Sequence, residues 1–273
     1  MLALASLVLV GILVLPLNIS SNTVVGVTYV DGFGHDPETV KENIGVIAGK
    51  GYGLVRVVWG MQHDLDVLAP SIEAFISACA EHKLYTYVVV NSEPGRLEFQ
   101  VEQTYLGKLE QFLGRYGNQV SFLQIFNEID DLRKSDGTNY MPSEIVNCVK
   151  LMALKAKAVS PQTKIVATFT QLATIRLDLL SKLGELRDCI DYVGLDIYAD
   201  AQALAKTSID QLAQASGKSV IVTETGSNNP DPAAKASQIR QSVQLYRNLA
   251  VLIVIVFDWS GSTYSVKDLD LKW

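Results

Sequence analysis

The sequence predicts an α/β fold, a single (β/α)8 TIM barrel, and three observations lead to this prediction. Eight short apolar runs alternate with seven longer amphipathic stretches along the 273 residues. The apolar runs are continuous, which is typical of parallel strands buried on both faces. The length suits one barrel, which commonly takes about 250 residues. We expect the eighth helix to be truncated or missing, with the apolar N-terminus as one candidate to cover the gap.

The expected strands and helices follow one another in strict order. Pro142 and Pro232 each stand at a predicted helix start, where the missing N–H of proline costs nothing. A doubly wound sheet is disfavoured because no GxGxxG phosphate loop follows the first strand. The strands are predicted at 24–30, 54–59, 84–91, 121–127, 164–169, 192–197, 219–223 and 251–258. The helices are predicted at 38–49, 70–82, 99–115, 142–158, 173–186, 201–215 and 233–249.

Composition places the chain among globular proteins and argues against a nucleic-acid partner. Hydrophobic residues make up 48% of the chain and charged residues 19%, unlike a disordered protein. The formal net charge is −6, whereas a nucleic-acid partner would require a basic surface. Cys79, Cys148 and Cys189 lack metal-ligand spacing, so we expect buried thiols and no metal site. One disulfide with a spare thiol is the alternative.

The first 21 residues form an apolar segment that we separate from a barrel domain at 22–273. Residues 2–17 are apolar except at three positions. This run is short for a membrane span, which needs about 20 apolar residues, and it resembles the h-region of an export signal. We therefore expect a secreted protein or one anchored to the membrane on the extracellular side. A packed N-terminal helix is the third alternative.

Two of the predicted strands end in a glutamate. The fourth runs into the sequence FLQIFNE, ending at Glu128, and the seventh into VIVTE, ending at Glu224. Reactive residues of this fold lie at the C-terminal ends of the strands. The fourth and seventh strands lie across the barrel from each other, so the two carboxylates can face one another over a central cleft. Arg56, within the second strand, requires an anionic partner if it is buried.

Five motifs together resemble clan A of the retaining glycoside hydrolases, a superfamily of cellulase-like (β/α)8 glycosidases. They are the Asn127-Glu128 pair, Glu224 before Thr-Gly, Arg56, Tyr198 after the sixth strand, and Trp259 after the eighth. No single motif is specific. Their order at successive strand ends is more specific, and the resemblance covers roughly residues 24–270.

The resemblance implies a glycosidase that cleaves a β-linked oligo- or polysaccharide by retaining double displacement. Glu128 would be the general acid/base and Glu224 the nucleophile. Asn127 would bind the 2-hydroxyl of the sugar. Because both carboxylates belong to the protein, no metal or organic cofactor is expected.

The resemblance also implies substrate contacts around this pair. Tyr198 would donate to Glu224, Arg56 would orient it, and Trp259 would stack under the sugar ring. Asn91 ends the third strand, where the clan often has a histidine, so we include it among the substrate-binding residues.

Two rival functions remain open from the sequence. One is a catalytically inactive barrel that binds carbohydrate at a cell surface. The other is a barrel of different chemistry, such as an aldolase or a phosphate-binding isomerase. That chemistry would require a lysine at a strand end or a glycine-rich phosphate site, and no predicted strand ends in lysine. Arg56 could instead serve only a structural ion pair, and Tyr198 and Trp259 could be packing residues.

Overall fold

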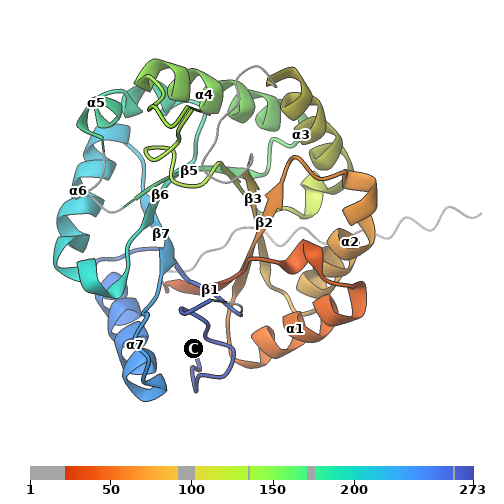
Figure 1. Cartoon of the computed structure of the whole chain (residues 1–273), viewed down its shortest axis with the longest axis vertical. Helices are drawn as coiled ribbons and strands as arrows, with labels where there is room; N and C mark the ends of the chain where they lie inside the picture. Colours follow the sequence, from red (N-terminus) through yellow and green to blue (C-terminus); the bar gives the residue numbers. More distant parts are fainter. Residues whose placement is uncertain (1–21, 92–101, 135, 171–175, 261) are drawn as a thin grey trace, which may run out of the picture.

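Eight parallel strands close into a barrel in which spatial neighbours follow the order of the chain (Figure 1). The computed structural model describes residues 22–91, 102–134, 136–170, 176–260 and 262–273. The strands are β1 (Val24–Tyr29), β2 (Leu54–Gly60), β3 (Tyr85–Asn91), β4 (Phe122–Ile125), β5 (Lys164–Phe169), β6 (Tyr192–Asp196), β7 (Val220–Thr225) and β8 (Ile253–Val256). All eight coincide with predicted strands, so the predicted barrel is confirmed.

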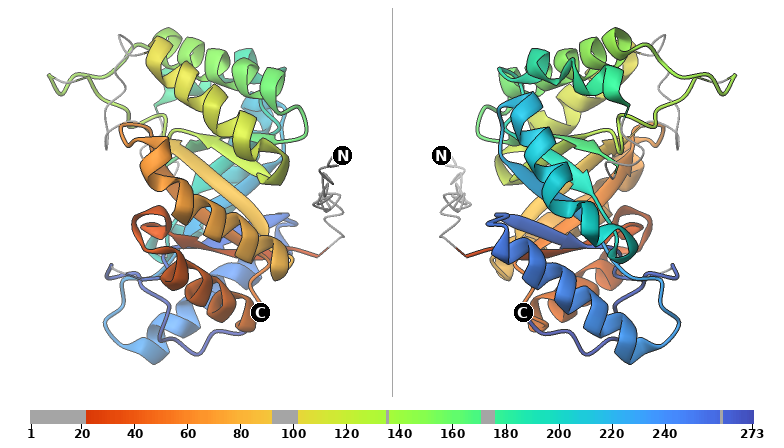
Figure 2. Two further views of the ribbon diagram at one scale, coloured as in Figure 1. Left: turned by 90° about the vertical axis from the view of Figure 1, so that its right-hand side faces the viewer. Right: turned by 90° about the vertical axis from the view of Figure 1, so that its left-hand side faces the viewer.

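Helices surround the barrel on its outside, as the two side views show (Figure 2). They are α1 (Pro37–Gly49), α2 (Leu65–Glu81), α3 (Glu102–Tyr116), α4 (Pro142–Val159), α5 (Leu177–Leu180), α6 (Ala205–Ser216) and α7 (Pro232–Asn248). The helix starts that we predicted at Pro142 and Pro232 are confirmed. Among the described residues, no helix is long and apolar enough to cross a membrane.

The long helix predicted at 173–186 is wrong over its described part. Only Leu177–Leu180 is α-helical, and a 3-10 turn follows at Leu183–Leu186. The Ser181 hydroxyl donates to the Asp178 carbonyl at 2.7 Å. That contact competes for a carbonyl group that a longer helix would use. Gly184 further lowers the helix propensity of this segment.

The C-terminal stretch takes the position of the eighth helix, which is absent from the described residues after β8. The stretch runs between α7 and α1 (Figure 1). The Lys50 ammonium donates to the Leu269 carbonyl at 2.6 Å, and the Trp273 amide donates to the Lys50 carbonyl at 3.2 Å. Val266 and Leu271 of this stretch are themselves buried. This sector is therefore covered by the C-terminal stretch. Residues 1–21, which we considered for that role and for export or anchoring, lie outside the described residues.

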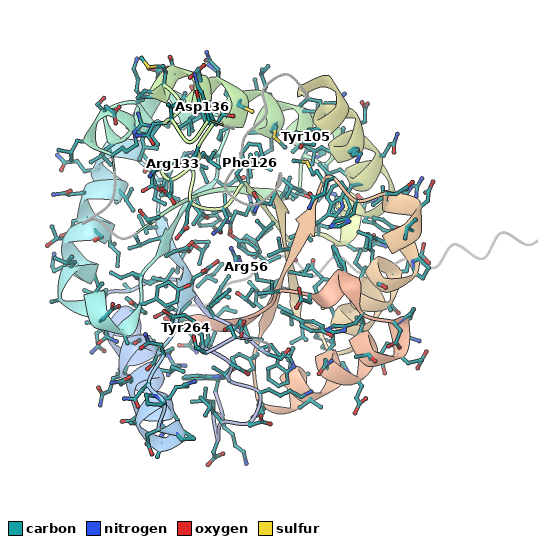
Figure 3. The ribbon with its side chains drawn as sticks, in the orientation of Figure 1. Arg56, Tyr105, Phe126, Arg133, Asp136 and Tyr264 are labelled. Atoms are coloured by element: carbon teal, nitrogen blue, oxygen red, sulfur yellow. The ribbon has the colours of Figure 1, made fainter. Side chains whose placement is uncertain are left out.

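The interior of the barrel changes from apolar to polar along the strands. Toward the N-terminal ends of the strands, the interior is filled by a cluster of apolar side chains from β2, β3, β4, β5, β7 and β8. Polar side chains follow toward the C-terminal ends, where Arg56 lies near the middle of the ring of strands (Figure 3). The buried polar groups at this level are Thr28, Arg56, Gln124, Thr168, Asp196, Thr223 and Glu224. The barrel interior is thus filled by apolar side chains at one end and lined by polar side chains at the C-terminal ends of the strands. The three cysteines are free and buried, as predicted.

Candidate active site

An irregularity in β7 directs Glu224 into the barrel. Leu195 pairs with Val222 and the next residue of β6, Asp196, pairs with Glu224, so β7 contains one extra residue there. Strict alternation would place Thr223 and Glu224 on opposite faces of the sheet. With the bulge, Thr223 donates to Asp196 at 2.7 Å inside the barrel, and Glu224 also faces inward. Bulges commonly re-aim a side chain in this way.

Arg56 joins Glu224 in a buried ion pair at 2.8 Å, with side-chain exposures of 1% and 8%. The guanidinium also donates to Asn127 Oδ1 at 2.8 Å, and to Gln124 Oε1 and Thr28 Oγ1 at 3.3 Å each. A buried ion pair is costly unless further hydrogen bonds offset its desolvation, and these three contacts of the guanidinium do so in part. Arg56, on β2, is therefore held by partners from β1, β4 and β7, and Asn127 just after β4 is one of them.

Tyr198 contacts the second oxygen of the same carboxylate. Its hydroxyl donates to Glu224 Oε2 at 2.6 Å. Burial, followed by the Glu224 and Asp196 charges, raises the pKa of the Tyr198 hydroxyl, which therefore remains a donor. One carboxylate oxygen thus meets a guanidinium and the other a phenol, and both contacts stabilise negative charge on Glu224.

Glu128 lies where the chain leaves β4 in an unusual backbone conformation. Phe126 and Glu128 have φ values of +59° and +46°, which cost L-residues about 1 kcal/mol or more each. Two contacts hold this bend. The Phe126 backbone N–H donates to the Val90 carbonyl at 2.9 Å, and the side-chain Nε2 of Gln124 donates to the Phe126 carbonyl at 3.0 Å. Such strained residues cluster at functional sites, because the surrounding structure must stabilise them.

The environment of Glu128 favours its protonated form. Burial and then the charges of Glu224, Asp130 and Asp131 raise the pKa of Glu128 to about 7, against the opposing effect of Arg56. Glu128 therefore holds a proton near neutral pH, whereas Glu224 faces two donors. Pairs of carboxyl groups in such different environments identify candidate acid and base roles.

Asp196 is a third carboxyl group at this site. It is 2% exposed, and its Oδ1 accepts from Thr223. Its Oδ2 is buried and has no hydrogen-bond partner among the described residues. Burial, and then the charge of Glu224, raises the pKa of Asp196 well above its usual range, although Arg56 opposes this. Burial therefore favours the neutral form of Asp196, and Glu224 is the carboxylate with which Arg56 forms its ion pair.

Several solved structures that share this fold are glycosidases. A β-glycosidase designated BGL167 superposes with a TM-score of 0.71 at 15% identity, over 88% of this chain and 87% of its own. The family 1 β-glucosidase from Thermotoga maritima gives 0.68 at 10% identity, over 88% and 89%. The endo-1,4-β-mannanase from Rhizomucor miehei gives 0.69 at 13% identity, over 87% and 86%. No protein-family model and no curated protein sequence matches the chain. Identities this low show a shared fold.

Trp259 does not lie where a sugar platform must lie. Its side chain is fully buried, with its indole N–H donating to Asn43 Oδ1 at 3.1 Å. The Lys50 ammonium lies 5.8 Å from its ring centroid. A platform needs an exposed ring face, which Trp259 lacks, so its geometry is that of a packing residue.

Phe257 and Tyr264 lie beside Tyr198 and were missed by our sequence reasoning. The ring centroids of Phe257 and Tyr264 are 6.3 Å and 4.9 Å from that of Tyr198. Phe257 is partly exposed and stands two residues after Ile255, which faces the barrel interior. Strand alternation from Ile255 could therefore have indicated Phe257 as an aromatic residue at the mouth.

Asn91 lies at the C-terminal end of β3. It follows Tyr87 and Val89, which face the interior, at intervals of two residues. Its carbonyl accepts from the Met61 amide at 2.8 Å and fixes the start of the loop after β2. The side chain is partly exposed on the inward-facing series. Its role in substrate binding stays a prediction.

Proposed function

We propose that this protein is a glycoside hydrolase that cleaves a β-linked oligo- or polysaccharide with retention of configuration. The observation that carries the proposal is the contrast between two carboxyl groups at the same end of the barrel. Glu224 accepts from Arg56 and Tyr198, whereas burial raises the pKa of Glu128 to about 7. The glycosidases among the structural neighbours support the same reaction class.

The first step forms a covalent intermediate. A Glu224 oxygen attacks the anomeric carbon while the Glu128 carboxyl group gives its proton to the departing glycosidic oxygen. The C–O bond to the leaving group breaks and an ester bond to Glu224 forms. As the carboxylate loses its charge, Arg56 keeps its partner Asn127 and is not left without a hydrogen bond.

The second step reverses these roles. Glu128, now ionised, takes a proton from a water molecule, and the resulting oxygen attacks the anomeric carbon. The ester bond breaks, Glu224 regains its charge, and the sugar leaves with its original configuration. The positive charge of Arg56 and the Tyr198 hydroxyl stabilise the returning carboxylate.

Asn127 would bind a hydroxyl group of the reacting sugar in both steps. Its Oδ1 accepts from both Arg56 and Gln124, at 2.8 Å and 2.9 Å. These contacts fix the orientation of the amide and leave its Nδ2 group to donate to a sugar hydroxyl. A contact to the 2-hydroxyl strengthens in the transition state and would contribute to catalysis as well as to binding.

Trapping of the intermediate tests this mechanism. The protein is incubated with 2,4-dinitrophenyl 2-deoxy-2-fluoro-β-glucoside and the corresponding β-mannoside, and its peptides are analysed by mass spectrometry. We expect one fluorosugar on the peptide that contains Glu224, and no label in Glu224→Gln. Glu128→Gln should still be labelled, because dinitrophenolate leaves without a proton, yet it should lose hydrolysis of unactivated oligosaccharides.

Two results would contradict the mechanism. A first-formed product of inverted configuration, read by NMR of the anomeric proton, would exclude the covalent step. Binding of oligosaccharides without any turnover would support the inactive carbohydrate-binding barrel instead.

A further inference from the structure

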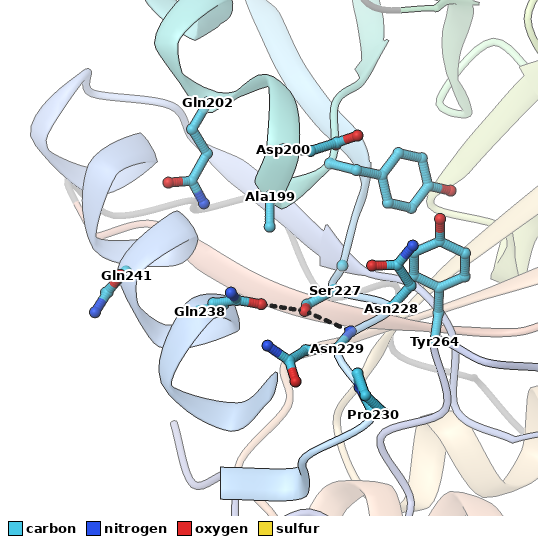
Figure 4. Close-up of a pocket in the computed structure, with 12 residues that line it drawn as sticks. Ala199, Asp200, Gln202, Ser227, Asn228, Asn229, Pro230, Gln238, Gln241 and Tyr264 are labelled. Carbon is cyan, nitrogen blue, oxygen red and sulfur yellow. Dashed lines mark hydrogen bonds between the residues drawn. The ribbon is translucent and has the colours of Figure 1, made fainter. Parts of the chain in front are cut away.

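A polar pocket of about 440 Å³ adjoins the candidate nucleophile, between the loops that follow β6 and β7 (Figure 4). We call it the loop 6–7 pocket. Tyr198, Gly226 and Tyr264 belong to its lining, and Tyr198 also donates to Glu224. The pocket and the catalytic carboxylate therefore share one wall. Its volume lies within the range of about 300–1,000 Å³ that is usual for small-molecule sites.

The lining of the pocket suits an uncharged ligand that is rich in hydroxyl groups. Most of its polar side chains are amides, which both donate and accept hydrogen bonds. Asp200 is its only charged residue, so the described lining has no lysine, arginine or histidine to pair with an anion. The amide side chains belong to Gln202, Asn228, Asn229, Gln238 and Gln241.

The polar wall on the β7 side is organised by its own hydrogen bonds. Ser227 is buried and donates to Gln238 Oε1, which leaves the Gln238 Nε2 group available as a donor. The Asn229 amide donates to Ser227 Oγ at 3.2 Å, and the Asp231 amide donates to Asn229 Oδ1 at 3.0 Å. These contacts tie the loop to α7 before any ligand enters, so little ordering is required on binding.

Two tyrosine rings provide the apolar part of the pocket. The centroids of Tyr198 and Tyr264 lie 4.9 Å apart, with the ring planes inclined at 46°. An aromatic face stacks on the C–H face of a pyranose, while neighbouring amides bind its hydroxyl groups. A sugar ring offers both kinds of surface, whereas a lipid or a phosphate group offers only one of them.

We propose that the loop 6–7 pocket binds a second, neutral sugar unit of the substrate, next to the unit that reacts at Glu224. The inference rests on the proposed function and makes its substrate class specific. The substrate is an oligosaccharide of at least two uncharged sugars, and uronic acids are excluded from this position. A carboxylate there would lie near Asp200 without a compensating cation among the described lining residues.

Kinetics with long and short substrates test the proposal. Asn228→Ala and Gln238→Ala are compared with Gln244→Ala, an exposed amide on the same helix as Gln238 but outside the pocket. On cellotetraose or mannotetraose, the two pocket variants should lose about 3- to 10-fold in kcat/KM, as expected for one hydrogen bond each. On 4-nitrophenyl β-glucoside or β-mannoside, all three should remain within about 2-fold of the unmodified protein. Equal losses on both substrate lengths, or none, would overturn the proposal.

A binding measurement separates the pocket from the catalytic mechanism. Glu224→Gln, alone and combined with Asn228→Ala, is titrated calorimetrically with cellotetraose, mannotetraose and an acidic oligosaccharide containing β-linked glucuronate. We expect a neutral tetrasaccharide to bind, the double variant to weaken it about 3- to 10-fold, and the acidic one to bind more weakly. If these binding results are obtained but the unmodified protein turns over no substrate, the proposed hydrolase function is refuted and the proposed role of the pocket stands. No neutral binding, or equal binding of the acidic sugar, would remove the pocket proposal.

Discussion

Replacement of Glu128 by glutamine should change the pH dependence of the stability of the protein, in favour of the variant as the pH rises. The pKa of Glu128 lies at about 7 in the folded protein, against 4.5 ordinarily. A carboxyl group with a raised pKa contributes its full stability below about pH 4.5. That contribution is lost as the pH rises through about 7. Glutamine has nearly the same shape and does not titrate.

The magnitude follows from the two pKa values. The difference between 4.5 and about 7, at 1.36 kcal/mol per pH unit, corresponds to about 3 kcal/mol. Below pH 4.5 the free energies of unfolding of the two proteins should differ by a constant. Between pH 4.5 and 7.5 the difference should shift in favour of Glu128→Gln by up to about 3 kcal/mol, and then level off.

Urea unfolding at a series of pH values measures this shift. Urea is uncharged and leaves the electrostatic screening unchanged. Trp59 and Trp259 are fully buried and provide a fluorescence signal. Glu42→Gln, on the exposed face of α1, is the matched control, and it should leave the pH dependence of unfolding unchanged. A stability difference for Glu128→Gln that stays constant from pH 4.5 to 8.5 would refute the reasoning from burial and from the neighbouring Glu224 charge.

Three further substitutions test other contacts of the site. Tyr198→Phe removes a 2.6 Å hydrogen bond to the Glu224 carboxylate, so kcat/KM should decrease about 10- to 100-fold. The acidic limb of the pH–rate profile should move to higher pH, and an unchanged profile would contradict this role of Tyr198. In Asp196→Asn the side chain cannot ionise. Because burial raises the pKa of Asp196 and favours its neutral form, activity at pH 7 should stay within about 3-fold, and a large loss would mean that the negative charge is required. Trp259→Phe removes the hydrogen bond to Asn43 and should lower the free energy of unfolding, measured in urea titrations, by about 1–3 kcal/mol. The KM should not change, and a raised KM would support the role of Trp259 as a sugar platform.

The strand pattern of this fold could be predicted because each strand is buried on both faces. A continuous apolar run is then the only pattern that fits, and its polar end marks the mouth of the barrel. The short α5 could not be predicted, because the hydrogen bond from Ser181 to the Asp178 carbonyl depends on local geometry that the apolar pattern does not encode.

The positions of the two glutamates in the fold could be predicted from the sequence, and their surroundings less so. Glu128 and Glu224 each end a strand, and that position alone indicates the mouth of the barrel. The raised pKa of Asp196 depends first on burial and then on the charge of Glu224 on the neighbouring strand, and the sequence around Asp196 shows neither. Trp259 lies three residues beyond the end of β8 at Val256, so strand alternation does not fix the side to which its ring points, and the ring is buried in the structure.

The bulge in β7 determines which side chains at the end of this strand face the barrel interior. In a regularly paired strand, Thr223 would face the interior and Glu224 would face the helices. The extra residue is accommodated so that Glu224 meets Arg56, and the buried ion pair therefore selects this arrangement over the regular one. A polar residue fixes the register of a coiled coil in the same way, at a cost in stability. An uncharged residue at position 56 would remove this preference, so Glu224 would no longer be held at the mouth of the barrel although both glutamates remained in the sequence.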